Sequence, residues 1–228
     1  MAKIIVAAPP FPGEFAPLLQ IGRGLADRGH QVTMLTWSSV RANVEQAGLA
    51  FVPVAGAADY DFQEMAARNA AQQPGPPQLN FGFIESFIKP MPGEHAALQE
   101  LLRADPDQYL LSNNLITGGW PVRQGAPGLR PVRWVAVSAV PVLLDSEDTT
   151  FFGPAPAGPG EDPKAANRAA NAQFRALLKP SDDHADKVLA DLGGAPLASP
   201  FIDALYTVAD AKYAAHDPLS EIERLLLG

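Results

Sequence analysis

The sequence predicts a single α/β domain with a doubly wound, mostly parallel sheet. Three observations lead to this fold class. The chain opens on a continuous apolar run, "KIIVAA", which is typical of a strand buried on both faces. Apolar residues then recur at helical spacing, and a second β-rich run follows them. This alternation of strand and helix repeats along the chain, as it does in parallel sheets covered by crossover helices.

The first 54 residues supply the clearest strand–helix alternation. Apolar positions from Leu18 to Ala26 mark the first helix, and Gly29 is a typical stop signal after it. A second, short helix ends before Gly48. The expected strands are 3–8, 31–37 and 51–54, and the second helix is expected over 39–47.

The rest of the chain is looser. The Pro/Gly-rich loop Phe151–Pro163 is long enough to serve as a lid or a binding segment. Residues 1–216 are expected to form the domain, and 217–228 a capped terminal helix that packs on it. The other expected elements are a helical region from 81 to 102 kinked near Pro90–Pro92, strands at 108–114 and 132–140, helices at about 164–178, 182–192 and 201–210, and a candidate edge strand at 211–216.

Composition excludes several classes of function. The formal charge is −8 and no basic run is present, so no nucleic-acid partner is expected. The absence of cysteine excludes disulfides and thiolate chemistry. No apolar segment approaches the roughly 20 residues of a membrane helix, and the N-terminal run is too short for a signal peptide. We therefore expect a soluble cytoplasmic protein that does not bind membranes.

Glycines near the first helix do not form a dinucleotide-binding loop. Gly22, Gly24 and Gly29 have the wrong spacing and follow the strand-to-helix turn, which favours close packing of helix on sheet. No phosphate loop and no G-x-S-x-G motif is present. The histidines are scattered, so neither a metal nor another cofactor is expected; they are His30, His95, His184 and His216.

Candidate binding residues follow the carboxyl ends of the strands, where open parallel sheets bind ligands. Aromatic residues nearby could supply an apolar wall, with the alternative that they are simply part of the core, where single aromatic residues are found more often. The candidates are Phe11, Gly13, Glu14 and Phe15 in the first loop, Asn113 and Asn114 after a later strand, Ser138, Val140 and Asp145 after the next, and the wall residues Phe81, Phe83, Phe87, Phe151 and Phe152.

Several segments resemble macrolide-type family 1 glycosyltransferases, which have the GT-B fold. The resemblance begins with "PFPGEFAPLLQIGRGLADRGHQVTML", continues through "EHAALQELL", "LLSNNLITG" and "VAVSAVPVLLDSEDTTFFG", and ends with "SPFIDALYTVAD". It implies a Rossmann-like acceptor-binding domain for an apolar natural product. In this family a second domain holds the nucleotide-sugar through a His-Gly-rich, acidic motif. No such motif is present here, so a truncated homologue is expected that does not hold the sugar donor by itself.

The resemblance also implies a changed catalytic pair. The family's base is a histidine in a Gly-His-x-x-Pro pattern, and here Gly13 and Pro17 flank Glu14 instead. The aspartate that orients the histidine corresponds to Asn113. Two neighbouring carboxylates would repel, whereas an asparagine amide can donate to Glu14 and hold its direction. Glu14 is therefore expected to act as an acid/base or as an anchor, with the alternative that it is a loop residue without a role.

Three functions remain open at this stage. The first is a donor-independent enzyme of natural-product biosynthesis, such as a polyketide cyclase or isomerase, with Glu14 as acid/base and Asn113 as its orienting partner. The second is the acceptor half of a genuine glycosyltransferase completed by a separate donor domain. The third is a non-catalytic natural-product-binding protein. In all three the ligand is a hydrophobic small molecule, and an apolar face left without its partner domain would favour a homodimer.

Overall fold

The computed structural model describes residues 1–139, 146–207 and 218–227. Its centre is a five-stranded sheet in the order β3-β2-β1-β4-β5, and every neighbouring pair is parallel. The strands are β1 (Lys3–Ala7), β2 (Gln31–Thr36), β3 (Ala50–Pro53), β4 (Gln108–Asn113) and β5 (Trp134–Val137). The α/β fold class predicted from the sequence is confirmed, although β5 is shorter than the expected strand 132–140. The candidate strand 211–216 lies outside the described residues.

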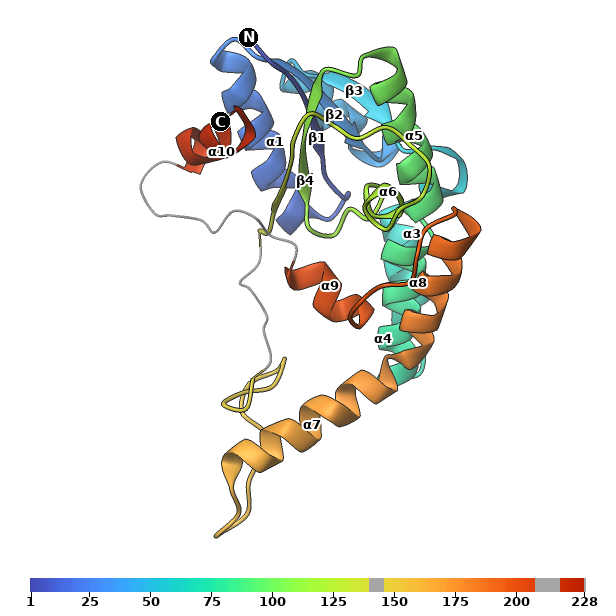
Figure 1. The fold of residues 1–228 in the computed structure, drawn as a ribbon, viewed down its shortest axis with the longest axis vertical. Coiled ribbons are helices and arrows are strands. Elements are labelled where there is room, and N and C mark those ends of the chain that lie inside the picture. The colour runs from blue at the N-terminus through green and yellow to red at the C-terminus, as the bar shows by residue number, and fades with distance from the viewer. Residues whose placement is uncertain (140–145, 208–217, 228) are drawn as a thin grey trace.

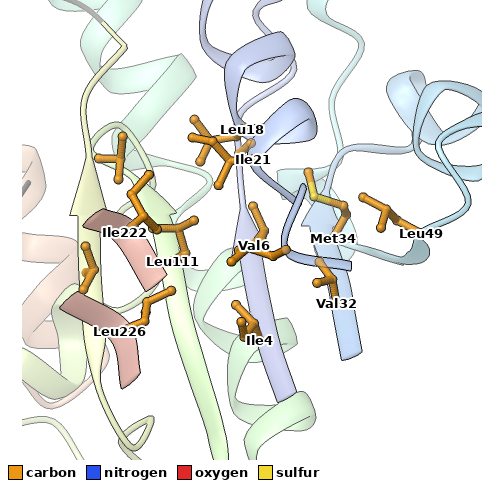
Figure 2. Packing of buried hydrophobic residues seen from close by; sticks show 14 of the residues in the cluster. Ile4, Val6, Leu18, Ile21, Val32, Met34, Leu49, Leu111, Ile222 and Leu226 are labelled. Atoms are coloured by element: carbon orange, nitrogen blue, oxygen red, sulfur yellow. The ribbon is translucent and has the colours of Figure 1, made fainter. Parts of the chain in front are cut away.

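Alternating side chains of the strands face two separate cores. Ile4 and Val6 of β1 point toward α1 (Pro12–Asp27), and Figure 2 shows them packed with Leu18, Met34 and other apolar residues. Ile5 and Ala7 of the same strand face α5 (Met91–Ala104) on the opposite side. The sheet is thus covered on both faces, as a doubly wound fold requires.

The glycines of the first helix allow two close contacts. A Cβ at Gly22 would lie 3.3 Å from the side chains of Met34 and Leu49, so this glycine lets α1 approach β2. A Cβ at Gly24 would lie 2.6 Å from Leu219 of α10 (Pro218–Leu227). The predicted close packing is therefore right for Gly22, whereas Gly24 packs against a helix rather than the sheet. Gly29 has a φ of 88°, which fits its predicted place after the helix.

The last helix lies on the same face of the sheet as α1. It contacts α1, β4 and β5, and Ile222 and Leu226 complete the core there (Figure 2). Glu223 accepts a hydrogen bond from His30 Nε2 at 2.8 Å, because His30 Nδ1 already accepts one from the backbone N–H of Ala2. Figure 1 places the N-terminus and this helix close together.

Between β3 and β4 the chain forms a helical layer. It comprises η2 (Gly56–Ala58), α3 (Phe62–Ala70), α4 (Pro76–Phe83), a π-helical turn η3 (Ile84–Ile88) and then α5. The connection from β2 to β3 is formed by η1 (Ser38–Val40) and α2 (Arg41–Gln46). Near the kink predicted at Pro90–Pro92 the helical run is interrupted, since the π turn ends at Ile88 and α5 begins at Met91. π-helical turns are rare in proteins, and those that do occur are often found at functional sites.

The remaining helices lie beyond the carboxyl ends of the strands. They are α6 (Trp120–Arg123), α7 (Pro163–Leu177), α8 (Lys179–Asp191) and α9 (Phe201–Thr207). Helix α8 packs on η3, α4, α7 and α9, whereas α7 extends away from the sheet as an arm (Figure 1). The side chain of Asp162 caps α7 by accepting from the N–H groups of Lys164 and Ala165. In the described ranges no helix is long and apolar enough to cross a bilayer.

Candidate functional site

Glu14 and Asn113 meet where the strand order reverses. From β1 the chain proceeds through β2 and β3 on one side of the sheet, and it returns to form β4 on the other side of β1. The loop that follows β1 and the residues that end β4 therefore lie side by side, at the place where open α/β sheets bind ligands. Glu14 stands in the first turn of α1, and Asn113 is the last residue of β4.

The two side chains are joined by a short hydrogen bond. Asn113 Nδ2 donates to Glu14 Oε2 at 2.6 Å, as expected for an amide that replaces an aspartate. Asn113 Oδ1 accepts from the backbone N–H of Leu115 at 2.9 Å, so the NH2 group must face Glu14. Asn113 is completely buried, and Glu14 is 6% exposed. The amide thus fixes one carboxylate oxygen from a rigid position in the sheet.

The other oxygen of Glu14 is left open. Oε1 forms no hydrogen bond with any residue of the described ranges. It is also not fully buried, so a ligand can reach it. Glu14 also lies at the N-terminal end of α1, where the unpaired N–H groups favour a negative charge. A carboxylate held in this way can accept a hydrogen bond, or a proton, from a ligand hydroxyl.

Gly13 leaves room beside this carboxylate. A Cβ at Gly13 would meet no atom within 4 Å, and its φ does not fall in the left-handed region. Neither packing nor backbone conformation therefore requires glycine at this position. Gly13 is exposed, so the start of α1 offers an open surface next to Glu14.

A continuous row of aromatic rings leads away from this helix start. Phe11, the residue before α1, contacts Phe62 at a centroid distance of 5.1 Å and Phe87 at 5.7 Å. Phe87 continues to Phe83 at 6.1 Å, and Phe83 to Phe201 of α9 at 6.2 Å. Phe201 in turn packs on Trp120 at 5.5 Å. The structure thus brings together the predicted Phe11, Phe83 and Phe87, and it adds Phe62, Phe201 and Trp120.

One side of this row borders an open depression of about 400 Å³. Its lining combines aromatic surface with amide and hydroxyl groups, as ligand sites commonly do. Within it, Asn69 Oδ1 is buried and has no hydrogen-bond partner. The depression is lined by Asn69, Gln78, Leu79, Gly82, Phe83, Ser86 and Phe87.

Several predicted binding residues lie elsewhere. Phe15 was predicted as a binding residue of the first loop, and the structure instead places it in the core under α1 at 6% exposure. Phe81 packs under the guanidinium of Arg68. Phe151 and Phe152 pack with Phe174 on the arm, with centroid distances of 5.1–5.6 Å, and are not part of the row. The predicted single wall is therefore split in two.

The remaining predicted residues have mixed placements. Asn114 is buried and donates from Nδ2 to the backbone carbonyl of Leu205 at 3.0 Å, which ties β4 to α9, whereas its Oδ1 has no partner. Ser138 follows β5 directly and is half-buried. Val140 and Asp145 lie outside the described residues.

A second buried acid, Glu94 in the first turn of α5, was not predicted. Its Oε2 accepts from the backbone N–H groups of Thr117 at 2.8 Å and Gly118 at 2.7 Å, and so holds the loop after β4. Its Oε1 is buried without a partner. Burial raises the pKa of the Glu94 carboxyl from 4.5 to about 7, against the opposing effect of these hydrogen bonds. The sequence signal is a second Pro-Gly-Glu at residues 92–94.

Ionic groups around these residues do not form a metal centre. Within the part of the chain that the structure describes, no three acidic or histidine side chains are grouped so that they could hold a metal ion.

Comparison with known proteins finds glycosyltransferases that are similar to this chain. No family model matches. The chain is 32% identical over 216 residues to UDP-glycosyltransferase 2 of Phaeomoniella chlamydospora, and 28% identical over 214 residues to UDP-glucosyltransferase B1 of Starmerella bombicola. Each alignment covers 91% of this chain and 47% of the relative. The chain thus spans about half the length of the curated relatives it matches.

The fold agrees with this relationship. The crystal structure of CalG4, the calicheamicin glycosyltransferase, superposes with a TM-score of 0.55 at 16% identity, over 92% of this chain and 46% of that one. The chain is thus a homologue of GT-B glycosyltransferases and has the fold of their N-terminal domain.

Proposed function

We propose that this chain is the acceptor-binding half of a glycosyltransferase, and that it binds an apolar molecule bearing a hydroxyl group. The observation that carries the proposal is the Glu14–Asn113 pair at the switch point of the sheet, with one carboxylate oxygen fixed and the other open. The homology to UDP-glycosyltransferases supports the reaction class. The aromatic row supports the apolar nature of the ligand.

In this proposal Glu14 is the base. The acceptor hydroxyl donates to Glu14 Oε1, and its oxygen attacks the anomeric carbon of a nucleoside diphosphate sugar held by a separate donor domain. The bond from that carbon to the diphosphate breaks, and the hydroxyl proton passes to Glu14. Asn113 stays hydrogen-bonded to Oε2 and keeps Oε1 directed at the acceptor, which reduces the reorganisation needed in the transition state.

The residue types of the Glu14–Asn113 pair favour a second candidate function. The glycosyltransferase family that the sequence resembles has a histidine and an aspartate at these positions, whereas this chain has Glu14 and Asn113. A carboxylate held by an amide can remove a proton from one carbon or oxygen of a substrate and return it to another. A donor-independent cyclase or isomerase would use the same pocket. The homology supports the glycosyltransferase half more strongly than this repurposed enzyme.

The role of Glu14 is tested by pairs of ligands that differ in one group. Hydroxylated polycyclic aromatic compounds and their O-methyl ethers are titrated into the parent protein and Glu14→Gln by calorimetry. We expect the parent to bind the hydroxyl form about tenfold more tightly, since a hydrogen bond to a charged group is worth about 1.5–3 kcal/mol. Glu14→Gln is expected to lose this preference, and Glu45→Gln, an exposed control on α2, to keep it. Equal binding of both forms by the parent would contradict the proposal.

Product analysis separates the candidate functions. Incubation with the bound compound and UDP-glucose, with and without a donor domain from a relative, gives a glycosylated product only if the first proposal holds. A rearranged product formed without any sugar donor would instead establish the donor-independent enzyme. Tight binding without any product in all arms would identify a non-catalytic binding protein.

A further inference from the structure

A second cavity lies on the α5 face of the sheet, at β5, the edge strand of the described sheet. It is half-open and has a volume of about 270 Å³. It shares no residue with the Glu14–Asn113 pair, with the aromatic row or with the depression beside the row. Its lining is Leu98, Gln99, Leu110, Gly119, Val122, Arg123, Leu129, Arg130, Pro131 and Trp134.

The inner part of the cavity is apolar and fixed in shape. Leu98, Leu110 and Val122 are buried and form its floor. Trp134 forms a wall, and its indole N–H donates to Ser112 Oγ at 2.8 Å. Gly119 makes room for the ring, because a Cβ there would lie 2.7 Å from the indole. A flat apolar group could therefore enter without rearrangement of the wall.

The mouth of the cavity is cationic. Arg123 lies over the Trp134 ring, 5.8 Å from its centroid, and Arg130 donates to the backbone carbonyl of Val122 at 3.2 Å. Both arginines are exposed, and neither forms an ion pair with any residue in the described ranges. Other arginines of this acidic chain do pair with carboxylates, among them Arg28, Arg41, Arg68, Arg168 and Arg175.

The segment that carries Arg130 is held in place from inside the fold. The buried side chain of Gln99 donates to the backbone carbonyl of Leu129 at 2.9 Å and accepts from its N–H at 2.7 Å. This pair of bonds fixes the loop at the mouth relative to α5. The guanidinium group of Arg130 thus extends from a fixed loop, and that of Arg123 extends from α6.

We propose that this cavity binds a small organic anion with a flat apolar body, such as an aromatic carboxylate. The ring lies against Trp134 and the apolar floor, and the anionic group lies at the mouth between Arg123 and Arg130. Guanidinium groups bind carboxylates through two parallel hydrogen bonds, which suits an anion with two oxygens. The site is independent of the acceptor site proposed above.

The three tryptophans of the chain provide a direct readout. A ¹H–¹⁵N spectrum contains one indole N–H signal from each, and the signal lost in Trp134→Phe identifies Trp134. Addition of 2-naphthoate is expected to move the Trp134 signal in a saturable way and to leave Trp37 unchanged, because Trp37 is buried in the core under α5. Methyl 2-naphthoate has the same rings without the charge, and we expect it to bind at least tenfold more weakly.

Substitution of the two arginines tests whether they bind the anionic group of the ligand. Arg123→Gln/Arg130→Gln is expected to weaken 2-naphthoate binding about tenfold or more, and added salt should weaken binding to the parent as well. Arg41→Gln is the matched control, since Arg41 also lies over an aromatic ring, that of Phe51, and is far from the cavity in the fold. The proposal is overturned if the ester binds as tightly as the acid, if the Trp134 signal does not move, or if the double variant binds like the parent. The ester comparison uses the parent protein alone, so it decides the matter even if the double variant does not fold.

Discussion

Helices α1 and α5 begin with the same five-residue pattern, and the structure uses it in two different ways. Both have Pro-Gly-Glu-x-Ala in the first turn, at residues 12–16 and 92–96. In both the proline stands at one of the first two helical positions, where its missing N–H costs nothing. In both the glutamate is buried, at 6% exposure for Glu14 and 1% for Glu94.

The glycines differ most. A Cβ at Gly93 would lie 2.2 Å from the backbone carbonyl oxygen of Ala55 and 2.5 Å from the Cβ of Ala58. Gly93 is therefore required for α5 to pack against the segment after β3. Gly13 faces open space, so its small size is needed by nothing in the described fold. One glycine closes a contact between elements, and the other leaves a surface open.

The two glutamates show the same contrast between a closed contact and an open surface. Glu94 binds backbone N–H groups of the loop after β4 through Oε2, and its Oε1 is sealed inside the protein. Glu14 binds a single side-chain donor, Asn113, and keeps Oε1 accessible. A buried acid at the start of a helix is therefore a candidate ligand-binding residue only when one of its carboxylate oxygens remains accessible. Glu94 serves the scaffold, and we propose that Glu14 serves a ligand.

The largest effect is expected from alanine at the two glycines. Gly93→Ala should lower the free energy of unfolding by about 3 kcal/mol or more, because the clash is with backbone atoms that cannot rotate away. Gly13→Ala should change it by less than about 1 kcal/mol, and toward greater stability, since alanine is the better helix former. Urea unfolding of both variants measures the difference. Similar losses at both positions would remove the structural basis of the comparison.

The pH dependence of stability distinguishes the two acids next. The pKa of Glu94 is raised by burial from 4.5 to about 7, so the native state keeps its proton longer than the unfolded chain. The stabilising contribution of the protonated Glu94 carboxyl is fully present below pH 4.5 and is lost as the pH rises toward 7. The loss lowers the free energy of unfolding by about 3 kcal/mol.

Glu94→Gln mimics the protonated acid and should remove this slope. We expect the variant to match the parent near pH 4.5 and to exceed its unfolding free energy by up to about 3 kcal/mol at pH 8. Unfolding in urea at both pH values checks this, with the exposed Glu45→Gln as control. A variant that is less stable than the parent at pH 8 would show that Glu94 is held as a stabilising anion.

A smaller effect is expected when the pair at α1 is made doubly acidic. Asn113→Asp places a second carboxylate within hydrogen-bond distance of Glu14, in place of a donor. The repulsion should raise the pKa of the pair and cost about 2 kcal/mol of stability at pH 8. This loss should diminish as the pH falls, because protonation restores a donor. Asn43→Asp, on the exposed face of α2, should show no comparable pH-dependent loss.

The sequence predicted those features that depend on local alternation and on strand ends. The strand–helix alternation of residues 3–54 defines β1 to β3, and the meeting of Glu14 with Asn113 follows once the two strands that precede them are neighbours. Phe15 was misplaced because adjacent helical residues point about 100° apart. Its position three residues before Leu18 puts it on the core stripe rather than beside Glu14.

Other features depend on contacts that no local pattern encodes. Phe87 lies in the π turn at Ile84–Ile88, and Phe151 and Phe152 pack against Phe174 of α7 instead of joining the aromatic row. Glu94 escaped notice because an acid in a first helical turn is ordinary in sequence. Only the packing of α5 against the loop after β4 shows that it is buried.

The most direct test of the account is a crystal structure of the chain with a hydroxylated aromatic compound that the parent binds. We predict that the ligand hydroxyl oxygen lies about 3 Å from Glu14 Oε1, with its rings along Phe11 and Phe87, and that Glu94 makes no contact with it. A ligand bound away from Glu14, or an Oε1 atom already occupied by a donor from the protein, would contradict the claim that this carboxylate is the functional one.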